Sequence, residues 1–231
     1  MQQKTSRTLW IVGTPLNEDL YLSPEAIACL KSVEVVIGEN RKQLHRYLRS
    51  IPEPRPFQMI YLDPERPEEV EAWRTALKER KVTALLSDTG MPCLFDPGVE
   101  ILRFARKEGY TIRSCPSATS WGTAAAVSGF APPFTLVGFP PRKTEDREQA
   151  WKKLSKTTGN LVLLETPYRF PLLLDELPRY FPASREVFLA WEIARPTEHF
   201  WWGSLSELPK WAEKNALKKG EFILILANSD A

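Results

Sequence analysis

The sequence predicts an α/β protein of two domains, each built around a mostly parallel sheet. Two observations predict the fold class: strand-like runs alternate with helical patterns along the 231 residues, and those runs are apolar without interruption. Uninterrupted apolar strands are typical of a sheet covered by helices on both faces. Near Pro116 the alternation gives way to the small-residue run PSATSWGTAAAVSG and the turn FAPPF. We therefore expect one domain over residues 1–116 and a second over 117–231.

In the first domain, helix starts and stops are marked by specific residues. Ser23 and Pro24 predict a helix start, because Ser is a favoured N-cap and Pro is favoured at the first helical position. Gly109 predicts a helix end. The Pro-rich stretch 51–67 is assigned no element. Strands are expected at 8–13, 33–38, 81–87 and 110–115, and further helices at 41–49, 68–79 and 99–108.

The second domain repeats the alternation after a helix of small residues between 116 and 129. Strands are expected at 134–139, 160–165, 186–191, 199–203 and 221–227, and helices at 145–157, 169–180 and 206–216.

Composition excludes several classes of protein. With 43% hydrophobic and 26% charged residues and a net charge of +2, the chain resembles an ordinary globular protein. No apolar run approaches 18 residues and the N-terminus lacks a signal-peptide core, so we expect a cytoplasmic protein with no membrane partner. Three Cys without CxxC spacing and two distant His favour reduced thiols and no metal site. The spacing of the eleven Gly excludes both the GxGxxG fingerprint and the P-loop.

Two stretches of the chain are basic. Residues 41–55 carry five basic side chains against one acidic, and residues 140–156 carry six against three. They are either ordinary solvated surfaces or a phosphate-binding footprint. In the second case the side chains that would share one cleft mouth are Arg41, Lys42, Arg46, Arg49, Arg142, Lys143 and Arg147.

The loop SDTGMPCLFDPG, residues 87–98, is the most informative segment. It follows a predicted buried strand and precedes a predicted helix, where open parallel sheets bind ligands. Its carboxylate at Asp88 and its Gly residues suit a ligand with a cationic end that approaches the backbone closely. The bland alternative is a strand-to-helix turn that binds nothing.

This loop resembles the SDAGTPLISDPG loop of the tetrapyrrole methylase superfamily, nearest its ribosomal small-subunit RNA methyltransferase I branch, with seven of twelve positions identical. Further blocks match in order: Thr14-Pro15 (family TP), GFPPRK at 138–143 (GFLPRK), LETPYR at 164–169 (YESPHR), Ala190-Trp191-Glu192 (ARE) and KGEFILIL at 219–226 (KGEFVLVV).

The resemblance implies a two-domain methyltransferase with S-adenosylmethionine in a cleft between the domains, working as a homodimer. By the family's pattern the cofactor would be lined by Pro15, Asp88, Gly90, Met91, Pro92, Thr119, Ser120, Leu164, Trp191 and Gly220. For Leu164 and Trp191 core packing is an equal alternative, and the Thr119-Ser120 pair has a competing role as a helix N-cap.

Three carboxylates stand at or just after predicted strand ends and match family positions: Glu39, Glu165 and Glu192. Each is a candidate general base, with an ion pair or a helix N-terminal role as the alternative. The candidates for holding substrate phosphates are Arg41, Arg142, Lys143 and Arg169. The Trp residues 191, 201, 202 and 211 belong either to the core or to a dimer interface.

The chain also departs from the family at 14–21, 39–43, 61–65 and 116–120, where the Gly-Asn and His positions are missing. The segments facing the acceptor differ more than those facing the cofactor. The departures therefore bear on the acceptor and not on methyl transfer. The resemblance and the two basic stretches make the leading interpretation methylation of ribosomal RNA at a cytidine ribose 2′-oxygen, with the small ribosomal subunit as partner. The alternatives are methylation of a tetrapyrrole or other small molecule, and a binding protein that has lost its acceptor site.

Overall fold

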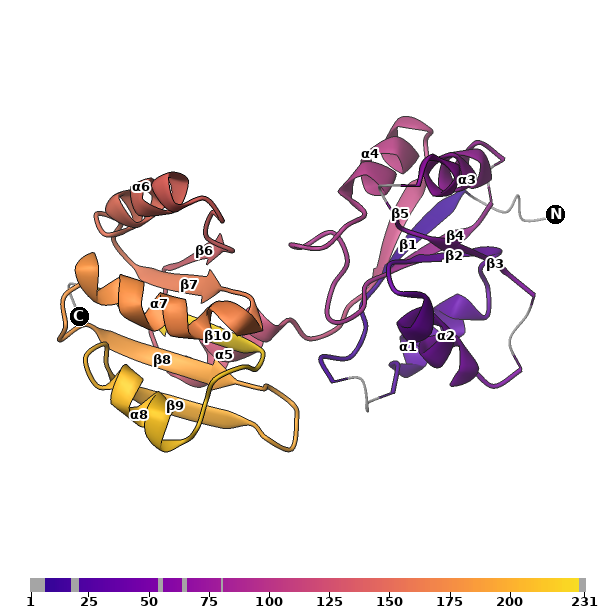
Figure 1. Ribbon diagram of the computed structural model, residues 1–231. Coiled ribbons are helices and arrows are strands. Elements are labelled where there is room, and N and C mark those ends of the chain that lie inside the picture. Colours follow the sequence, from indigo (N-terminus) through magenta and orange to yellow (C-terminus); the bar gives the residue numbers. More distant parts are fainter. Residues whose placement is uncertain (1–6, 18–20, 54–55, 64–65, 80, 229–231) are drawn as a thin grey trace. The chain divides into compact units, whose positions relative to one another are not determined.

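The computed structural model describes residues 7–17, 21–53, 56–63, 66–79 and 81–228 (Figure 1). Parts of the segments 14–21, 41–55 and 61–65 discussed above lie outside these ranges. The chain divides into two compact units between Thr119 and Ser120. Each unit contains its own five-stranded sheet.

The first unit is built on a parallel sheet with the strand order β3-β2-β4-β1-β5. Its strands are β1 (Thr8–Val12), β2 (Val35–Gly38), β3 (Gln58–Tyr61), β4 (Thr83–Leu86) and β5 (Thr111–Cys115). Its helices are α1 (Pro24–Leu30), α2 (Arg41–Arg49), α3 (Pro67–Lys78) and α4 (Val99–Lys107). Helices α1 and α2 cover one face of the sheet, and α3 and α4 cover the other (Figure 1).

Both faces of this sheet are buried, which explains its uninterrupted apolar strands. Val12, Val36 and Leu86 pack against α1 and α2. Leu9 and Leu85 pack against α3 and α4. Successive residues of a strand point to opposite faces, so each strand contributes to both halves of the core.

The helix boundaries follow the capping signals in the sequence. The Ser23 hydroxyl accepts a hydrogen bond from Ala26 N at 3.1 Å and begins α1. The Asn40 side chain accepts from Lys42 N and Gln43 N and begins α2. Gly109, with φ +77°, follows the end of α4, as the sequence predicts.

Strands β1 and β4 form the point at which the connections of the sheet diverge. The chain leaves β1 through α1 on one face, and leaves β4 through α4 on the opposite face. Because β1 and β4 are hydrogen-bonded neighbours, the loops after them meet at the carboxyl edge of the sheet. Open α/β sheets bind ligands at this kind of switch point.

The second unit contains a mixed sheet with the order β6-β7-β10-β8-β9. Its strands are β6 (Phe134–Gly138), β7 (Asn160–Leu164), β8 (Glu186–Trp191), β9 (His199–Ser204) and β10 (Phe222–Leu226). Its helices are α5 (Ser120–Ser128), α6 (Thr144–Leu154), α7 (Phe170–Glu176) and α8 (Leu208–Lys214), with 3-10 turns η1 (Pro167–Arg169) and η2 (Leu177–Arg179) on either side of α7. Helix α5 covers one face, and α6, α7 and α8 cover the other (Figure 1).

The α/β class is confirmed, but the prediction of a mostly parallel sheet holds only for the first unit. In the second unit β6 and β7 are parallel, whereas the pairs β7–β10, β10–β8 and β8–β9 are antiparallel. The apolar runs are buried on both faces in either arrangement, because helices cover both faces of this sheet too. An uninterrupted apolar run therefore indicates that a strand is buried on both faces, but it does not indicate whether the strand pairs in parallel or antiparallel.

One strand was not expected. Residues 58–61, inside the Pro-rich stretch, form β3 at the edge of the first sheet. Proline is tolerated beside a short edge strand, so the Pro residues flank the strand without interrupting it. Within the described residues, no helix is long and apolar enough to cross a membrane.

Candidate active site

The loops after β1 and β4 are joined by a short backbone bridge at the switch point. Thr14 N donates to Gly90 O at 2.8 Å, and Gly90 N donates to Thr14 O at 3.2 Å. The hydroxyl of Ser117, which follows β5, donates to Thr14 O at 2.8 Å. Three neighbouring strand ends are thus fixed to one another. The bridge holds the predicted cofactor residues Pro15 and Gly90 on adjoining loops.

Two glycines make this close approach possible. A Cβ on Gly13 would lie 2.5 Å from the Ser117 Cβ and 2.6 Å from the Met91 Sδ, so no side chain fits there. Gly90 has φ +76°, in the left-handed region that glycine adopts without strain. Pro92 is buried and Met91 is half-buried. These two predicted cofactor residues therefore also pack inside the first unit.

Three carboxylates converge beside this loop. Burial, then Asp96, then Asp88 raise the pKa of Glu39, which follows β2, to about 7. Burial and Asp88 raise the pKa of Asp96 to about 6. One oxygen of Glu39, Oε1, is buried and has no hydrogen-bond partner within the described part of the chain. Mutual repulsion of this kind favours a bound cation.

The acidic loop is tied to helix α2. Asn40 N, just before the helix, donates to Asp88 Oδ1 at 3.2 Å. The Tyr47 hydroxyl, further along the helix, donates to Asp88 O at 2.7 Å. The predicted phosphate ligand Arg41 lies on the first turn of the same helix, exposed and 4.5 Å over the Tyr61 ring. These two hydrogen bonds hold helix α2 against the loop.

In the second unit, three of the predicted residues line a single pocket of about 640 Å³: Trp191, Glu192 and Gly220. A Cβ on Gly220 would collide with the Trp191 ring, so glycine is required where the two segments meet. Glu192 Oε1 accepts from Glu221 N at 2.5 Å, and its Oε2 pairs with Arg195 Nη1 at 2.9 Å. The rim is basic as well as acidic, with Arg195, His199, Lys218 and Lys219 among the lining residues.

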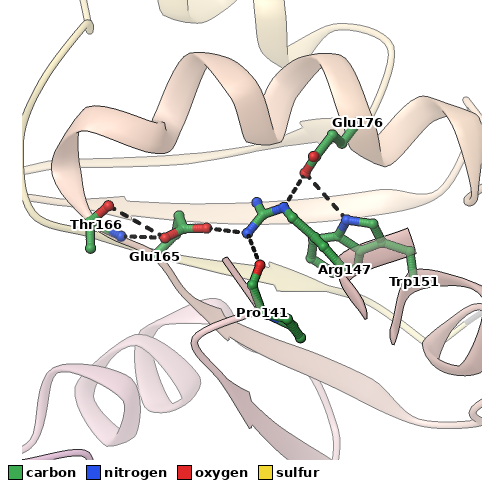
Figure 2. Close-up of polar contacts among 6 residues, drawn as sticks. All are labelled: Pro141, Arg147, Trp151, Glu165, Thr166 and Glu176. Carbon is green, nitrogen blue, oxygen red and sulfur yellow. Dashed lines mark hydrogen bonds and ion pairs between the residues drawn. The ribbon is translucent and has the colours of Figure 1, made fainter. Parts of the chain in front are cut away.

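Glu165 occupies a buried ion-pair network (Figure 2). Its Oε2 lies 2.7 Å from Arg147 Nη1, and both side chains are 3% exposed. Arg147 Nε in turn pairs with Glu176 at 2.7 Å, and Glu176 also accepts from the Trp151 indole. Glu165 Oε1 accepts from Thr166 N at 2.8 Å. The ion-pair alternative named for Glu165 is therefore realised in this structure.

Arg147 corrects one expectation. The sequence grouped it with the exposed basic side chains of residues 140–156, but Arg147 lies inside the second unit, between Glu165 and Glu176. It faces inward because its position on α6 lies on the side that packs against β7 and α7. The expected phosphate ligands Arg142 and Lys143, in contrast, are exposed between β6 and α6.

The remaining predicted residues are distributed as follows. Leu164 ends β7, is half-buried and packs against the core under α5. Arg169 ends η1 and is half-buried. Thr119 is the last residue of the first unit, and Ser120 begins α5 in the second. The Trp191, Trp201 and Trp211 rings pack in the second unit, whereas Trp202 is 46% exposed.

Several residues of this site carried a signal that sequence reasoning left unused. Asp96 lies in the 87–98 loop, where a role is predicted for its neighbours Asp88, Gly90, Met91 and Pro92 but not for Asp96. Tyr47 lies within the basic stretch 41–55 and Asn40 directly precedes it, and their charged neighbours are the more conspicuous residues. The Arg195 partner of Glu192 stands three residues away in the sequence, an ordinary ion-pair spacing.

The fold and this geometry define an α/β enzyme whose parallel sheet presents a glycine-supported acidic loop at its switch point. The model of the Tetrapyrrole (Corrin/Porphyrin) Methylases matches residues 8–209. The chain therefore belongs to this family, and it is a methyltransferase.

Named relatives refine the comparison. The chain is 31% identical to the ribosomal RNA small subunit methyltransferase I of Halalkalibacterium halodurans, over 97% of this chain and 77% of the relative. It is 28% identical to the protein of that name from Synechocystis, over 96% of this chain and 79% of the relative.

Solved structures share the fold. One is a cobalt precorrin-4 methyltransferase, with a TM-score of 0.66 and 16% identity, covering 96% of this chain and 95% of the other. Another is a uroporphyrin-III C-methyltransferase from Thermus thermophilus complexed with S-adenosylhomocysteine, with a TM-score of 0.60 and 20% identity, covering 96% and 97% of the two chains.

Proposed function

We propose that the chain transfers the methyl group of S-adenosylmethionine to ribosomal RNA, at the 2′-oxygen of a cytidine ribose. The observation that carries the proposal is the 31% identity, along 97% of this chain, to a protein named ribosomal RNA small subunit methyltransferase I. The two tetrapyrrole enzymes of known structure named above are 16% and 20% identical, so they support the fold and not their own substrates.

The residues of the first unit fit this cofactor. S-adenosylmethionine is a sulfonium cation with a transferable methyl group. Asp88 raises the pKa of both Glu39 and Asp96, so a cation beside Asp88 would relieve the repulsion among the three carboxylates. The Thr14–Gly90 bridge brings the backbones of the two loops together beside these carboxylates, and Gly90 has no side chain to separate them. Of the family positions, Met91 and Pro92 lie on this loop and Pro15 lies on the adjoining loop after β1.

Glu39 is the candidate general base that the structure favours most. A ribose hydroxyl is a weak acid, so its proton must leave as the oxygen bonds to carbon. A base works best with a pKa near the working pH, and burial with Asp96 and Asp88 raises the pKa of Glu39 to about 7. Glu165 is occupied by Arg147 and Thr166, and Glu192 by Arg195 and Glu221.

The proposal is tested by mapping ribose methylation of ribosomal RNA by mass spectrometry in a strain lacking the gene. We expect one methylated cytidine to disappear and to return when the wild-type chain is supplied. Glu39→Gln should fail to restore it, whereas Glu68→Gln, an exposed substitution on α3, should restore it fully. An unchanged methylation pattern would overturn the RNA acceptor and point to a tetrapyrrole or other small molecule.

We further propose that the chain acts in the cytoplasm as a homodimer on the small ribosomal subunit. Arg41, Arg142 and Lys143 are exposed and available for phosphates, and Arg169 is partly so. Trp202, 46% exposed on β9, is the candidate for a subunit interface. Analytical ultracentrifugation of wild type and Trp202→Ser tests the dimer, and methylation of intact subunits against free RNA tests the partner.

A further inference from the structure

A second pocket opens in the first unit, on the α3 and α4 side of the sheet. It has a volume of about 260 Å³. Its apolar wall comes from Leu62 after β3, Val70 and Trp73 on α3, and Val99 and Ile101 on α4. Of these lining residues, Val99 is 37% exposed. The volume is below the roughly 300–1,000 Å³ of typical small-molecule sites, so the pocket suits one flat ring and not a macrocycle.

The polar groups of this pocket are carboxylates. They belong to Asp63, Glu69, Asp96 and Glu100, and none of the described residues that line the pocket is basic. Glu69 accepts a hydrogen bond from Tyr61 N at 3.2 Å, and Asp63 pairs with Arg66 at 3.0 Å. Among the described residues of the lining, Asp96 and Glu100 remain to receive donors from a ligand. Inside such a pocket a phosphate or a tetrapyrrole carboxylate would be repelled, whereas N–H groups on a flat apolar ring would be attracted.

The position of the pocket links it to the reaction. Along the carboxyl edge of the sheet, the end of β3 with the pocket comes first, then Glu39 after β2, then Asp88 after β4. Asp96 belongs to both regions, because it lines the pocket and acts on Glu39 electrostatically. A nucleotide whose base entered the pocket would therefore bring its own ribose toward Glu39.

We infer that this pocket holds the base of the acceptor nucleotide, and that Asp96 and Glu100 select a base with an exocyclic amine, such as cytosine, over uracil. Carboxylates are the acceptors that recognise the cytosine amine in protein–nucleic acid complexes. The inference rests on the proposed function, since it assigns the specificity of the same reaction. Asp96 and Glu100 are specificity residues here, distinct from the proton acceptor Glu39.

The test is methyl transfer to two matched RNAs that carry cytosine or uracil at the acceptor position. For the wild-type chain we expect kcat/KM to favour cytosine at least tenfold, the factor that one good contact to a base supplies. Asp96→Asn with Glu100→Gln should bring the ratio close to one. Val99→Phe should reduce the volume of the pocket and raise KM for the cytosine RNA severalfold. The control Glu68→Gln, exposed on α3 outside the pocket, should keep the wild-type ratio.

Binding of S-adenosylhomocysteine is measured on every variant, to show that each is folded and keeps its cofactor site. Variants that bind it and methylate both RNAs in the wild-type ratio would overturn the pocket assignment and leave the proposed function intact. A wild-type chain that binds S-adenosylhomocysteine but methylates neither RNA would overturn the proposed function, and the pocket assignment with it.

Discussion

At the scale of single residues, the chemistry of the first unit centres on Glu39. This side chain follows β2 with one oxygen buried and unpartnered within the described residues. Burial, Asp96 and Asp88 all act in the same direction on its pKa. When no ligand is bound, ionisation of a group held in this way lowers the stability of the folded protein. Such strain is common where a protein binds or transforms a ligand.

Glu39→Gln is expected to stabilise the ligand-free chain at alkaline pH. The pKa of Glu39 is raised from 4.5 to about 7, so its contribution to stability is full below about pH 4.5 and is lost as the pH rises through 7. Glutamine keeps the neutral form at every pH. Urea unfolding should show the variant more stable than wild type by on the order of 1–3 kcal/mol at pH 8, and little changed at pH 5. A variant less stable at pH 8 would contradict the assigned cause of the shift.

The sequence was sufficient to place the candidate carboxylates but not to assign their partners. Glu39, Glu165 and Glu192 all follow strands, as predicted. Whether a carboxylate then meets a cation depends on residues far along the chain: Arg147 reaches Glu165 from α6, and Asp96 reaches Glu39 from another loop. Such pairing depends on tertiary packing, which local patterns do not report.

At the scale of elements, the bridge between the β1 and β4 loops depends on the left-handed backbone of Gly90. Gly90→Ala is expected to weaken S-adenosylhomocysteine binding about tenfold, because relaxing the strained backbone would shift the bridge and the acidic loop. The same change should cost about 1–2 kcal/mol of stability. Isothermal titration and urea unfolding measure the two effects.

The matched control is Gly129→Ala. Gly129 has φ +73°, close to the +76° of Gly90, but it lies beyond α5 with nothing within 4 Å of a Cβ. It should lose similar stability while its cofactor affinity stays at the wild-type value. Equal affinities of the two variants for S-adenosylhomocysteine would mean that the Thr14–Gly90 bridge is not part of the cofactor site.

Helix α6, strand β7 and helix α7 are held together by the buried network of Arg147, Glu165 and Glu176 (Figure 2). Arg147→Ala leaves two carboxylates without their cation, and removing one partner of a buried pair typically costs about 3–5 kcal/mol. We expect a loss of this size in urea unfolding, whereas Arg142→Ala, at an exposed site nearby, should change stability by less than about 0.5 kcal/mol. An Arg147→Ala variant as stable as the wild type would contradict the structural role of this ion pair, and Glu165 would again be a candidate general base.

Element positions were largely predictable and strand partners were not. Ser23 and Asn40 begin helices and Gly109 follows the end of one. Each acts on residues close to it in the sequence, so a local pattern can indicate the boundary. Strand β3 was missed because its four residues stand between prolines, and an edge strand needs only one ladder of bonds. The antiparallel pairs of the second sheet join residues as distant as Leu161 and Leu226.

At the scale of the whole molecule, the basic side chains predict a salt-dependent association with RNA. Replacing Arg142 and Lys143 by Ala should weaken RNA binding and lower the slope of log K against log salt by about 1 for each phosphate that is no longer neutralised. Both residues are exposed and distant in the sequence from the loops that bear on the cofactor. Filter binding at several salt concentrations measures the slope, and thermal stabilisation by S-adenosylhomocysteine should stay unchanged. An unaltered slope would mean that Arg142 and Lys143 do not contact RNA phosphates.

The central place of β10 has a consequence for synthesis of the chain. Residues 222–226 fill the middle of the second sheet, between β7 and β8, although they follow every other strand in the chain. The first sheet is complete by residue 115, so it can form while later residues are still being translated. The second sheet must wait, with β7 and β8 unjoined, until β10 has left the ribosome. A chain stopped after Lys219 should therefore lose most of its near-ultraviolet tryptophan dichroism, since six of its eight Trp lie beyond residue 119. A signal close to that of the full chain would mean that β7 and β8 find another partner.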